Sequence, residues 1–290
     1  MKIRFATALA ALSLAGLGLV ADPAQAATPG VSNEAEFLAA VENANADPSV
    51  TEIVFAPNAV IELTDEVRYT GLQDLTLVGR GAMISGATVT ADTDTWDSGL
   101  FVSESGGDLT VRRLTFANSF NNGLSVFLPP GSGTVEIVLD DVTVTKAQFH
   151  GVLIDGQATT GYNTDDFVHP NCVDPHPFDS GTSIDITVDR SEITGAGQLV
   201  GYDISQDTGC PQDFDGLRVD QGGAGDLVAD LDRSTFDDKL ADGVELDEKG
   251  DGSVDATVDR STFNANGDTT AIECTVEDLC GGDFGETIED

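Results

Sequence analysis

The sequence predicts an all-β protein, a parallel β-helix in which short coils of chain stack on one another. Two repeated patterns carry this prediction. A glycine followed by a short alternating strand recurs with starts 28, 65 and 27 residues apart, at Gly123, Gly151, Gly216 and Gly243. A strand that ends in Asp-Arg-Ser follows each of the last three, over 184–191, 227–234 and 254–261. Units of 27 or 28 residues that hold only short strands cannot bury an apolar face alone, so they must stack as a solenoid.

The composition agrees with a turn-rich β protein. The 290 residues include 32 Gly but only 3 Tyr and 1 Trp, and a hydrophobic fraction of 40% with 14 Phe suffices for a core. There are 51 Asp and Glu against 13 Lys and Arg, a formal net charge of −38. This charge would repel phosphate backbones, so nucleic-acid binding through counterion release is excluded as a function.

The first 26 residues have the pattern of a secretory signal peptide. Lys2 and Arg4 precede an apolar run over 5–21, and small residues lie where signal peptidase cleaves, over 24–26. An uncleaved anchor is the alternative, because a run of about 17 residues is at the lower limit for a membrane span. Cleavage would leave 11 basic and 50 acidic residues. We expect a secreted, extracellular and strongly acidic protein without a membrane span.

The start of the mature chain predicts a helix that caps the first coil. Asn33 and Glu36 have the spacing of a capping box, and apolar residues at helical spacing continue up to Asp47-Pro48. Strand-like segments follow. Residues 31–63 are therefore the cap region of a single domain over 27–290, in which the helix covers the strand edges of the first coil.

The 65-residue interval between two glycine strands holds one coil and two insertions, over 157–182 and 197–215. We expect two long loops there, and long loops on a rigid scaffold often carry function. The first insertion contains His169 and His176, and His150 lies just before the Gly151 strand. Histidines clustered among aspartates suit a metal or acid–base site, and a surface loop with solvated histidines is the alternative.

Export makes the four cysteines candidates for disulfides, with three possible connectivities. We favour Cys172 with Cys210 and Cys274 with Cys280, because the second pair encloses a short loop and the first pair lies in irregular Pro/Asp/Gly-rich stretches. A metal site is the rival interpretation, but the spacings of a zinc site are absent.

Residues 31–86, with the predicted helix and then the segment Leu-Thr-Leu-Val-Gly-Arg-Gly-Ala-Met-Ile-Ser-Gly over 75–86, resemble the amino-terminal coil region of the pectate-lyase-like right-handed parallel β-helix superfamily. The later repeats resemble its generic coils. The resemblance covers most of the mature chain and implies right-handed coils, with 157–182 as a wall of a saccharide groove. A Trp-Ile-Asp-His strand and an Arg-x-Pro-x-x-Arg segment, which mark pectate lyases, are absent, so their catalytic residues are not carried over.

Alternation along the Asp-Arg-Ser strands predicts an outward column of aspartates, with Arg112 in the earliest copy: Asp140, Asp189, Asp232 and Asp259. Successive coils lie about 4.8 Å apart, so these carboxylates would repel one another. Diagonal pairing with Arg190, Arg233 and Arg260 would relieve the repulsion, and so would bound calcium. A solvated acidic face is the third interpretation, and the sequence leaves all three open.

Action on an extracellular polysaccharide is one functional hypothesis. Elimination on a uronate needs its carboxylate neutralised, for example by calcium on the aspartates, and a base, for which His150, Lys146 and Arg218 are the candidates. Glycoside hydrolysis needs only two carboxylates at a set separation. The alternative is a non-catalytic exported β-helix that binds a glycan or a surface, because a fold alone does not imply an activity.

Overall fold

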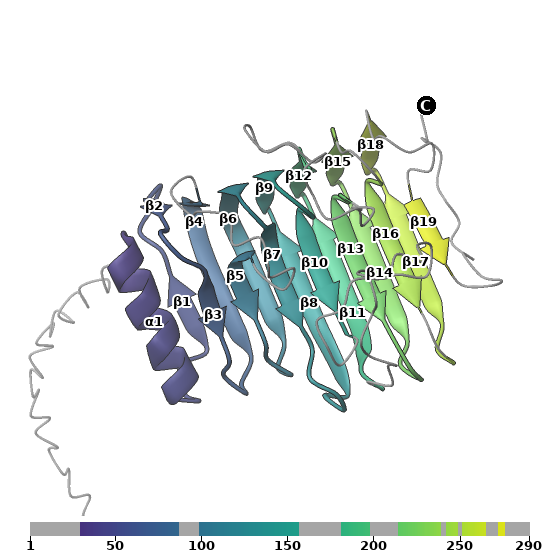
Figure 1. Cartoon of the computed structure of the whole chain (residues 1–290), viewed down its shortest axis with the longest axis horizontal. Helices are drawn as coiled ribbons and strands as arrows, with labels where there is room; N and C mark the ends of the chain where they lie inside the picture. Colours follow the sequence, from purple (N-terminus) through teal and green to yellow (C-terminus); the bar gives the residue numbers. More distant parts are fainter. Residues whose placement is uncertain are drawn as a thin grey trace, which may run out of the picture.

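The computed structural model describes residues 30–86, 99–156, 181–197, 214–238, 242–248 and 251–264, and the backbone of 272–275. Within these ranges the protein is all-β, with one helix and two sheets whose strands are parallel (Figure 1). The strands stack along the long axis of the molecule in chain order. This confirms the predicted all-β class and a solenoid-like arrangement of parallel strands.

Each coil contributes strands to both sheets. The 7-stranded sheet contains, in spatial order, β3 (Val67–Tyr69), β5 (Gly99–Ser103), β7 (Asn122–Phe127), β10 (Val152–Asp155), β13 (Leu217–Gln221), β16 (Val244–Glu248) and β19 (Ile272–Thr275). The 12-stranded sheet contains β1 (Glu52–Val54), β2 (Val60–Glu62), β4 (Leu75–Ser85), β6 (Leu109–Ser119), β8 (Thr134–Asp140), β9 (Thr143–Ala147), β11 (Ser183–Asp189), β12 (Glu192–Thr194), β14 (Leu227–Asp232), β15 (Thr235–Asp237), β17 (Val254–Asp259) and β18 (Thr262–Asn264).

The 12-stranded sheet turns a corner along its whole length. The first half of β6 pairs with β8 and its second half pairs with β9, so one strand passes through the corner. In later coils the chain is divided there into two strands, β11 with β12 and β14 with β15. Each coil therefore supplies one strand to the 7-stranded sheet and one to each side of this corner.

The Asp-Arg-Ser repeat makes the corner. Arg190, Arg233 and Arg260 take the left-handed backbone conformation with φ of 50°, 52° and 53°. The serines that follow point inward and are buried, and they stack as a ladder in which Ser191 N–H donates to Ser234 Oγ at 3.1 Å. The next step repeats the bond at 3.0 Å, so each buried backbone donor at the corner finds a hydroxyl acceptor.

The predicted register of the three Asp-Arg-Ser strands is confirmed. Asp189 in β11 pairs with Asp232 in β14, and Asp232 pairs with Asp259 in β17. Asp140 in β8 also pairs with Asp189, and Arg112 in β6 pairs with Asp140. The alternate residues of these strands are buried and form the core between the sheets.

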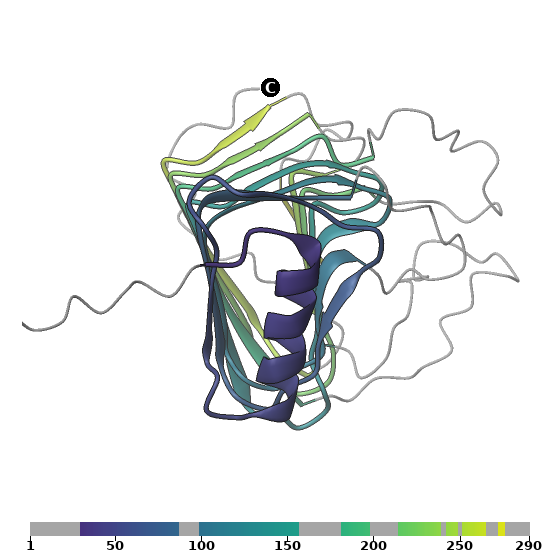
Figure 2. The same ribbon diagram turned by 90° about the vertical axis from the view of Figure 1, so that its left-hand side faces the viewer.

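The predicted capping helix is α1 (Glu34–Ala46). Asn33 is its N-cap, and its Oδ1 accepts from Glu36 N–H at 3.1 Å. The Glu36 carboxylate accepts from Ser32 N–H and Oγ–H, one residue before the position that a capping box uses. The ring of Phe37 lies 5.2 Å from that of Phe55, so the helix packs over the first coil, as Figure 2 shows.

Several sequence predictions lie outside the described residues. They concern the signal peptide over 1–26, the side chains of the four cysteines, and most of the insertions over 157–182 and 197–215. Among the described residues, no helix has the length and apolar character that a membrane crossing requires.

Candidate functional site

The structure brings two of the three predicted catalytic residues together, on the outer face of the 7-stranded sheet. His150 directly precedes the coil of β10, and Arg218 lies in the middle of β13. Both approach the carboxylate of Asp215, at 3.4 Å and 3.5 Å respectively. Lys146 lies in β9 of the other sheet, where it is exposed, and it does not join them.

Alternation along β13 and β16 explains this cluster. Leu217 and Val219 are core residues, so the intervening side chain of Arg218 points away from the core. Arg218 pairs in register with Glu245 of the next coil, and two residues further along Asp220 pairs with Asp247. Charged side chains of opposite sign therefore lie within one strand spacing of each other.

A second set of acids lies one residue before the glycine that starts each strand. Asp215 precedes Gly216 and Asp242 precedes Gly243. The backbone N–H of Asp242 donates to Asp215 Oδ1 at 3.0 Å, which holds the Asp215 carboxylate against the next coil. His150 has the same place before Gly151. We call the set His150, Asp215, Arg218, Asp220, Asp242, Glu245 and Asp247 the Arg218 cluster.

Arg218 is the centre of this cluster. Its Nη1 lies 2.7 Å from Glu245 Oε2, and its Nε lies 3.0 Å from Asp220 Oδ2. Only 5% of the residue is exposed. Burial by itself lowers the pKa of the guanidinium, but attraction to Asp220, Glu245 and Asp215 outweighs it and raises the pKa well above its ordinary value. Arg218 therefore stays charged, which does not suit the predicted role of a base.

His150 is held by its neighbours on both sides. Its backbone N–H donates to Asn122 Oδ1 at 3.0 Å, and its Nδ1 accepts from the backbone N–H of Asp215 at 3.3 Å. An Nδ1 that accepts a hydrogen bond carries no proton, so the neutral ring has its proton on Nε2. This bond positions the imidazole and occupies the lone pair that a base would use at Nδ1.

Three acids of the Arg218 cluster have the spacing of metal ligands. Asp215, Asp242 and Glu245 each offer a carboxylate oxygen, and the three oxygens lie within 4.8 Å of one another. All three residues are buried. These three residues were not predicted as ligands, although the repeated Asp-Gly step and the outward position of Glu245 are signals in the sequence.

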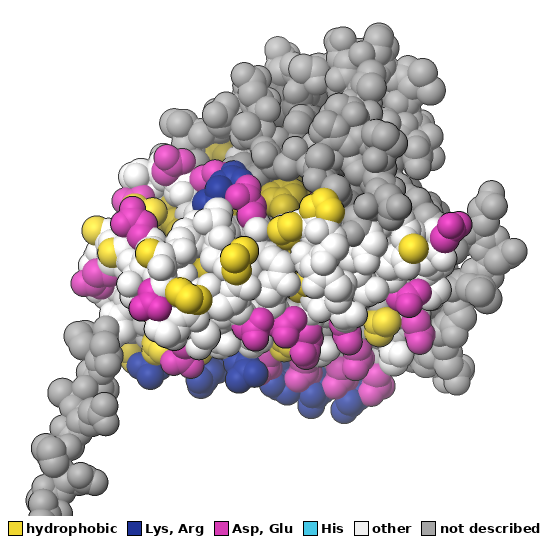
Figure 3. All heavy atoms as spheres, turned by 90° about the horizontal axis from the view of Figure 1, so that it is seen from below, with side chains coloured by type: hydrophobic (Ala, Val, Ile, Leu, Met, Phe, Trp, Pro, Cys, Tyr) yellow, Lys and Arg dark blue, Asp and Glu magenta, His cyan; other side chains and the backbone are white. Residues whose placement is uncertain are grey.

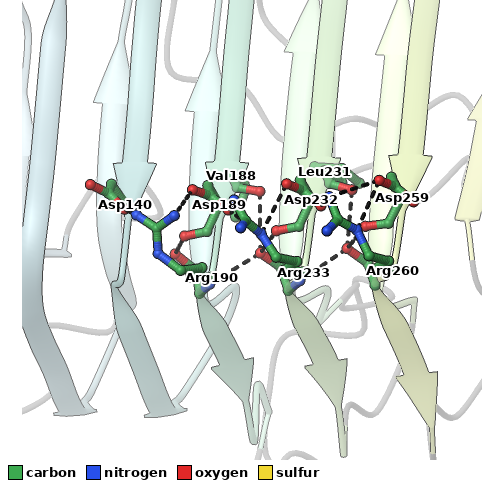
Figure 4. A network of polar contacts seen from close by, with 12 residues as sticks. Asp140, Val188, Asp189, Arg190, Leu231, Asp232, Arg233, Asp259 and Arg260 are labelled. Atoms are coloured by element: carbon green, nitrogen blue, oxygen red, sulfur yellow. Dashed lines mark hydrogen bonds and ion pairs between the residues drawn. The ribbon is translucent and has the colours of Figure 1, made fainter.

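The predicted outward aspartates form a separate site, which we call the Asp–Arg ladder: Asp140, Arg190, Asp189, Arg233, Asp232, Arg260 and Asp259. Figure 4 shows that each arginine lies between two aspartates of neighbouring coils. Arg190 pairs with Asp140 and Asp189. Arg233 pairs with Asp189 at 2.7 Å and with Asp232 at 3.0 Å.

The last step of the Asp–Arg ladder repeats this geometry, with Arg260 at 2.9 Å from both Asp232 and Asp259. The hydrogen bonds that Arg233 donates to the Asp189 carboxylate raise the pKa of Arg233 despite its exposure. Pairing with arginine, one of the two predicted ways to relieve the repulsion, is therefore present. Exposed pairs of this kind contribute about 0–1 kcal/mol each.

No protein-family model matches this chain, and neither a curated protein nor a solved structure does. The likeness to the pectate-lyase-like superfamily thus rests on sequence pattern alone.

Proposed function

We propose that the protein is an exported right-handed parallel β-helix that binds extracellular polysaccharide without cleaving it. The coil of three strands, repeated in register along two sheets, supports the β-helix. The handedness follows the rule that parallel crossover connections are right-handed, and the resemblance agrees. Export is supported by the signal-peptide pattern over 1–26.

The observation that carries the non-catalytic assignment is the burial of the Arg218 cluster. The exposed fractions of the Arg218, Asp215 and Glu245 side chains are 7%, 0% and 8%. A base must come within hydrogen-bond reach of the proton that it removes. Side chains buried to this degree, and bound to one another, are poorly placed to reach a bond in a polymer.

The exposed side of the 12-stranded sheet supports binding. Its polar side chains repeat from coil to coil, so that Thr262 Oγ1 donates to Thr235 Oγ1 at 3.2 Å and Asn264 N–H donates to Asp237 Oδ1 at 2.8 Å. Hydroxyl, amide and carboxylate groups in rows at strand spacing are suited to a linear ligand that repeats the same hydroxyl groups.

Binding and cleavage assays on the full mature chain test this proposal. Affinity electrophoresis with neutral and anionic polysaccharides should show retardation by at least one polymer. Absorbance of unsaturated uronate products and release of reducing ends should both stay at background. Steady product formation would overturn the non-catalytic assignment. If none of the polymers is bound, the binding function is wrong.

Glycoside hydrolysis is the second candidate, and one distance favours it. The carboxylate oxygens of Asp215 and Glu245 lie within 4.8 Å, close to the roughly 5 Å that separates the two carboxyl groups of retaining glycosidases. If hydrolysis is detected, Glu245→Gln should abolish it. Asp232→Asn, in the Asp–Arg ladder, should leave it unchanged.

Calcium belongs to the proposal as a structural ligand, and the Arg218 cluster suits it better than the predicted ladder does. Among the residues that the structure describes, five buried carboxylates lie around Arg218, and three of them bring oxygens within 4.8 Å of one another. In the ladder three arginines lie among four exposed or half-buried aspartates. Asp215, Asp242 and Glu245 would supply the hard oxygen ligands that calcium prefers.

A further inference from the structure

Arginines gather on one edge of this acidic protein. Figure 3 shows Lys and Arg side chains in a row along one border of the face. The edge is the corner of the 12-stranded sheet, and it carries Arg80, Arg112, Arg113, Arg190, Arg233 and Arg260. All six are exposed. With a formal net charge of −38, a row of cationic side chains along one edge is not explained by composition.

The backbone at this corner does not call for arginine. Arg80 and Arg113 have φ of 54° and 50°, as the later arginines do, and this left-handed region costs about 1–2 kcal/mol for most residues. Asn58 and Asp141, which tolerate the region better, occupy the same corner in other coils with φ of 55° and 58°. Arginine is therefore present for its side chain.

The row has two parts. In the later coils Arg190, Arg233 and Arg260 are neutralised by the aspartates of the ladder. In the earlier coils Arg80, Arg112 and Arg113 have no ion pair with any residue that the structure describes. Because Val78 pairs with Arg112 in register, these three arginines come from neighbouring strands, β4 and β6. They form an exposed cationic patch, which ends where Asp140 lies in register with Arg112.

We propose that Arg80, Arg112 and Arg113, the arginine patch, bind the carboxylate or sulfate groups of a linear anionic polysaccharide. This inference rests on the proposed polysaccharide binding and names its ligand class and its anchor. A guanidinium offers paired N–H donors in one plane, which match the two oxygens of a carboxylate or a sulfate. Strands about 4.8 Å apart would present these donors to successive charged groups of a polymer.

The surrounding acids do not prevent this binding at physiological ionic strength. Screening reduces charge interactions beyond about 8 Å, and Asp140, the acid in register with Arg112, is already paired with Arg190, so a polymer on the patch interacts mainly with the local arginines. A second copy of this chain is a poorer occupant, because two surfaces of high negative charge would meet over a large area. The patch therefore favours a thin anionic chain over a protein partner.

The test measures binding of the mature protein to polygalacturonate, dextran sulfate and neutral dextran. Arg113→Asn removes the guanidinium and introduces a residue that tolerates a φ of 50°, so the fold should persist. Binding to both anionic polymers should weaken about fivefold. Arg112→Gln, in regular strand, is the second variant and should act in the same direction. Added salt should weaken binding of the parent protein more than that of the variants.

Lys146→Asn is the matched control, because Lys146 is an exposed cation with φ of 58° away from the patch. It should leave binding unchanged. Equal weakening by Lys146→Asn, or dextran bound as tightly as the anionic polymers, would overturn the patch while leaving polysaccharide binding in place. Absence of binding to all three polymers would instead contradict the proposed function itself. Loss of self-association in Arg113→Asn would show that a second copy is the occupant.

Discussion

The Arg218 cluster and the Asp–Arg ladder are built from the same residue types at the same strand spacing, and they differ in their contact with water. Arg218 contacts Glu245 at 2.7 Å with 7% of its side chain exposed, and Arg233 contacts Asp189 at the same distance with 42% exposed. A buried charge that loses its partner has no water to replace it, and an exposed one does. Loss of one partner should therefore reduce the free energy of unfolding far more in the Arg218 cluster than in the Asp–Arg ladder.

Removing the central cation of the buried network should have the largest effect. Arg218→Met leaves Asp220, Glu245 and Asp215 without their guanidinium, and we expect the free energy of unfolding to fall by about 3–5 kcal/mol. Chemical denaturation measures this. Adding Asp220→Asn and Glu245→Gln should recover much of the loss, because the uncompensated charges are then gone. A loss below 1 kcal/mol would mean that burial does not distinguish the two networks.

Calcium should stabilise the protein through the buried network. At a hundredfold excess over Kd, binding to the folded state alone adds about 2.7 kcal/mol, and magnesium should be a poor substitute. Melting curves with each cation at equal ionic strength measure the difference. Asp242→Asn should remove the calcium-specific increment and Asp232→Asn should retain it. Loss of the increment in Asp232→Asn alone would move the site to the ladder, and identical shifts with both cations would leave no specific site.

Loss of a buried hydroxyl at the corner of the 12-stranded sheet should reduce stability by an intermediate amount. Ser234 is buried, and its Oγ accepts the backbone N–H of Ser191. Ser234→Ala leaves that buried donor without its acceptor and should cost about 1–3 kcal/mol in equilibrium unfolding. Thr235→Ala, just outside the corner, is the control and should change stability by much less.

Arg233→Asn should be close to neutral. The variant loses two exposed ion pairs, which contribute about 0–1 kcal/mol each, but asparagine suits the φ of 52° better than arginine does. Equilibrium unfolding should show the two effects nearly cancelling, with a smaller salt dependence than that of the parent. A loss as large as that of Arg218→Met would show that the ladder acts as one coupled unit.

The smallest effect should come from a carboxylate outside both networks. Hydrogen bonds from Ser32 lower the pKa of Glu36 below its ordinary value of 4.5. The carboxylate therefore stabilises α1 at neutral pH, and this contribution is lost as the pH falls from 4.5 through the lowered pKa. Glu36→Gln should be slightly less stable than the parent at pH 7 and equal to it in acid, as thermal melts across pH would show. A difference independent of pH would mean that packing is responsible.

The repeats made much of the fold predictable. Equal spacing and alternation were enough to place Asp189, Asp232 and Asp259 in one column, because a shift of the pairing by one residue would turn the apolar residues of these similar strands away from the core. The start of α1 was predicted from Asn33 for a local reason, the need of the first backbone donors for an acceptor. The contact between Glu36 and Ser32 was not predicted, because it depends on how far the glutamate side chain reaches.

The candidate site was predictable only in part. His150 and Arg218 were recognised as reactive residue types, yet nothing in the sequence joined them to Asp215, which is 65 positions from His150. Lys146 was considered equivalent to them and lies on another sheet. Residues on either side of an insertion come together only if the chain re-enters the stacked coils at the right place. Local sequence pattern does not encode that place.

By itself the sequence determined the coil length, the register of the Asp-Arg-Ser strands, the direction of their side chains and the start of the capping helix. Each depends on short-range periodicity or on a neighbour one repeat away. Only the tertiary structure decided that outward side chains on one sheet are buried and on the other are exposed, and hence that Arg218 is locked among carboxylates while Arg112 and Arg113 stay accessible. Alternation distinguishes the two faces of a strand, but the depth at which a charge lies depends on the packing of the whole chain.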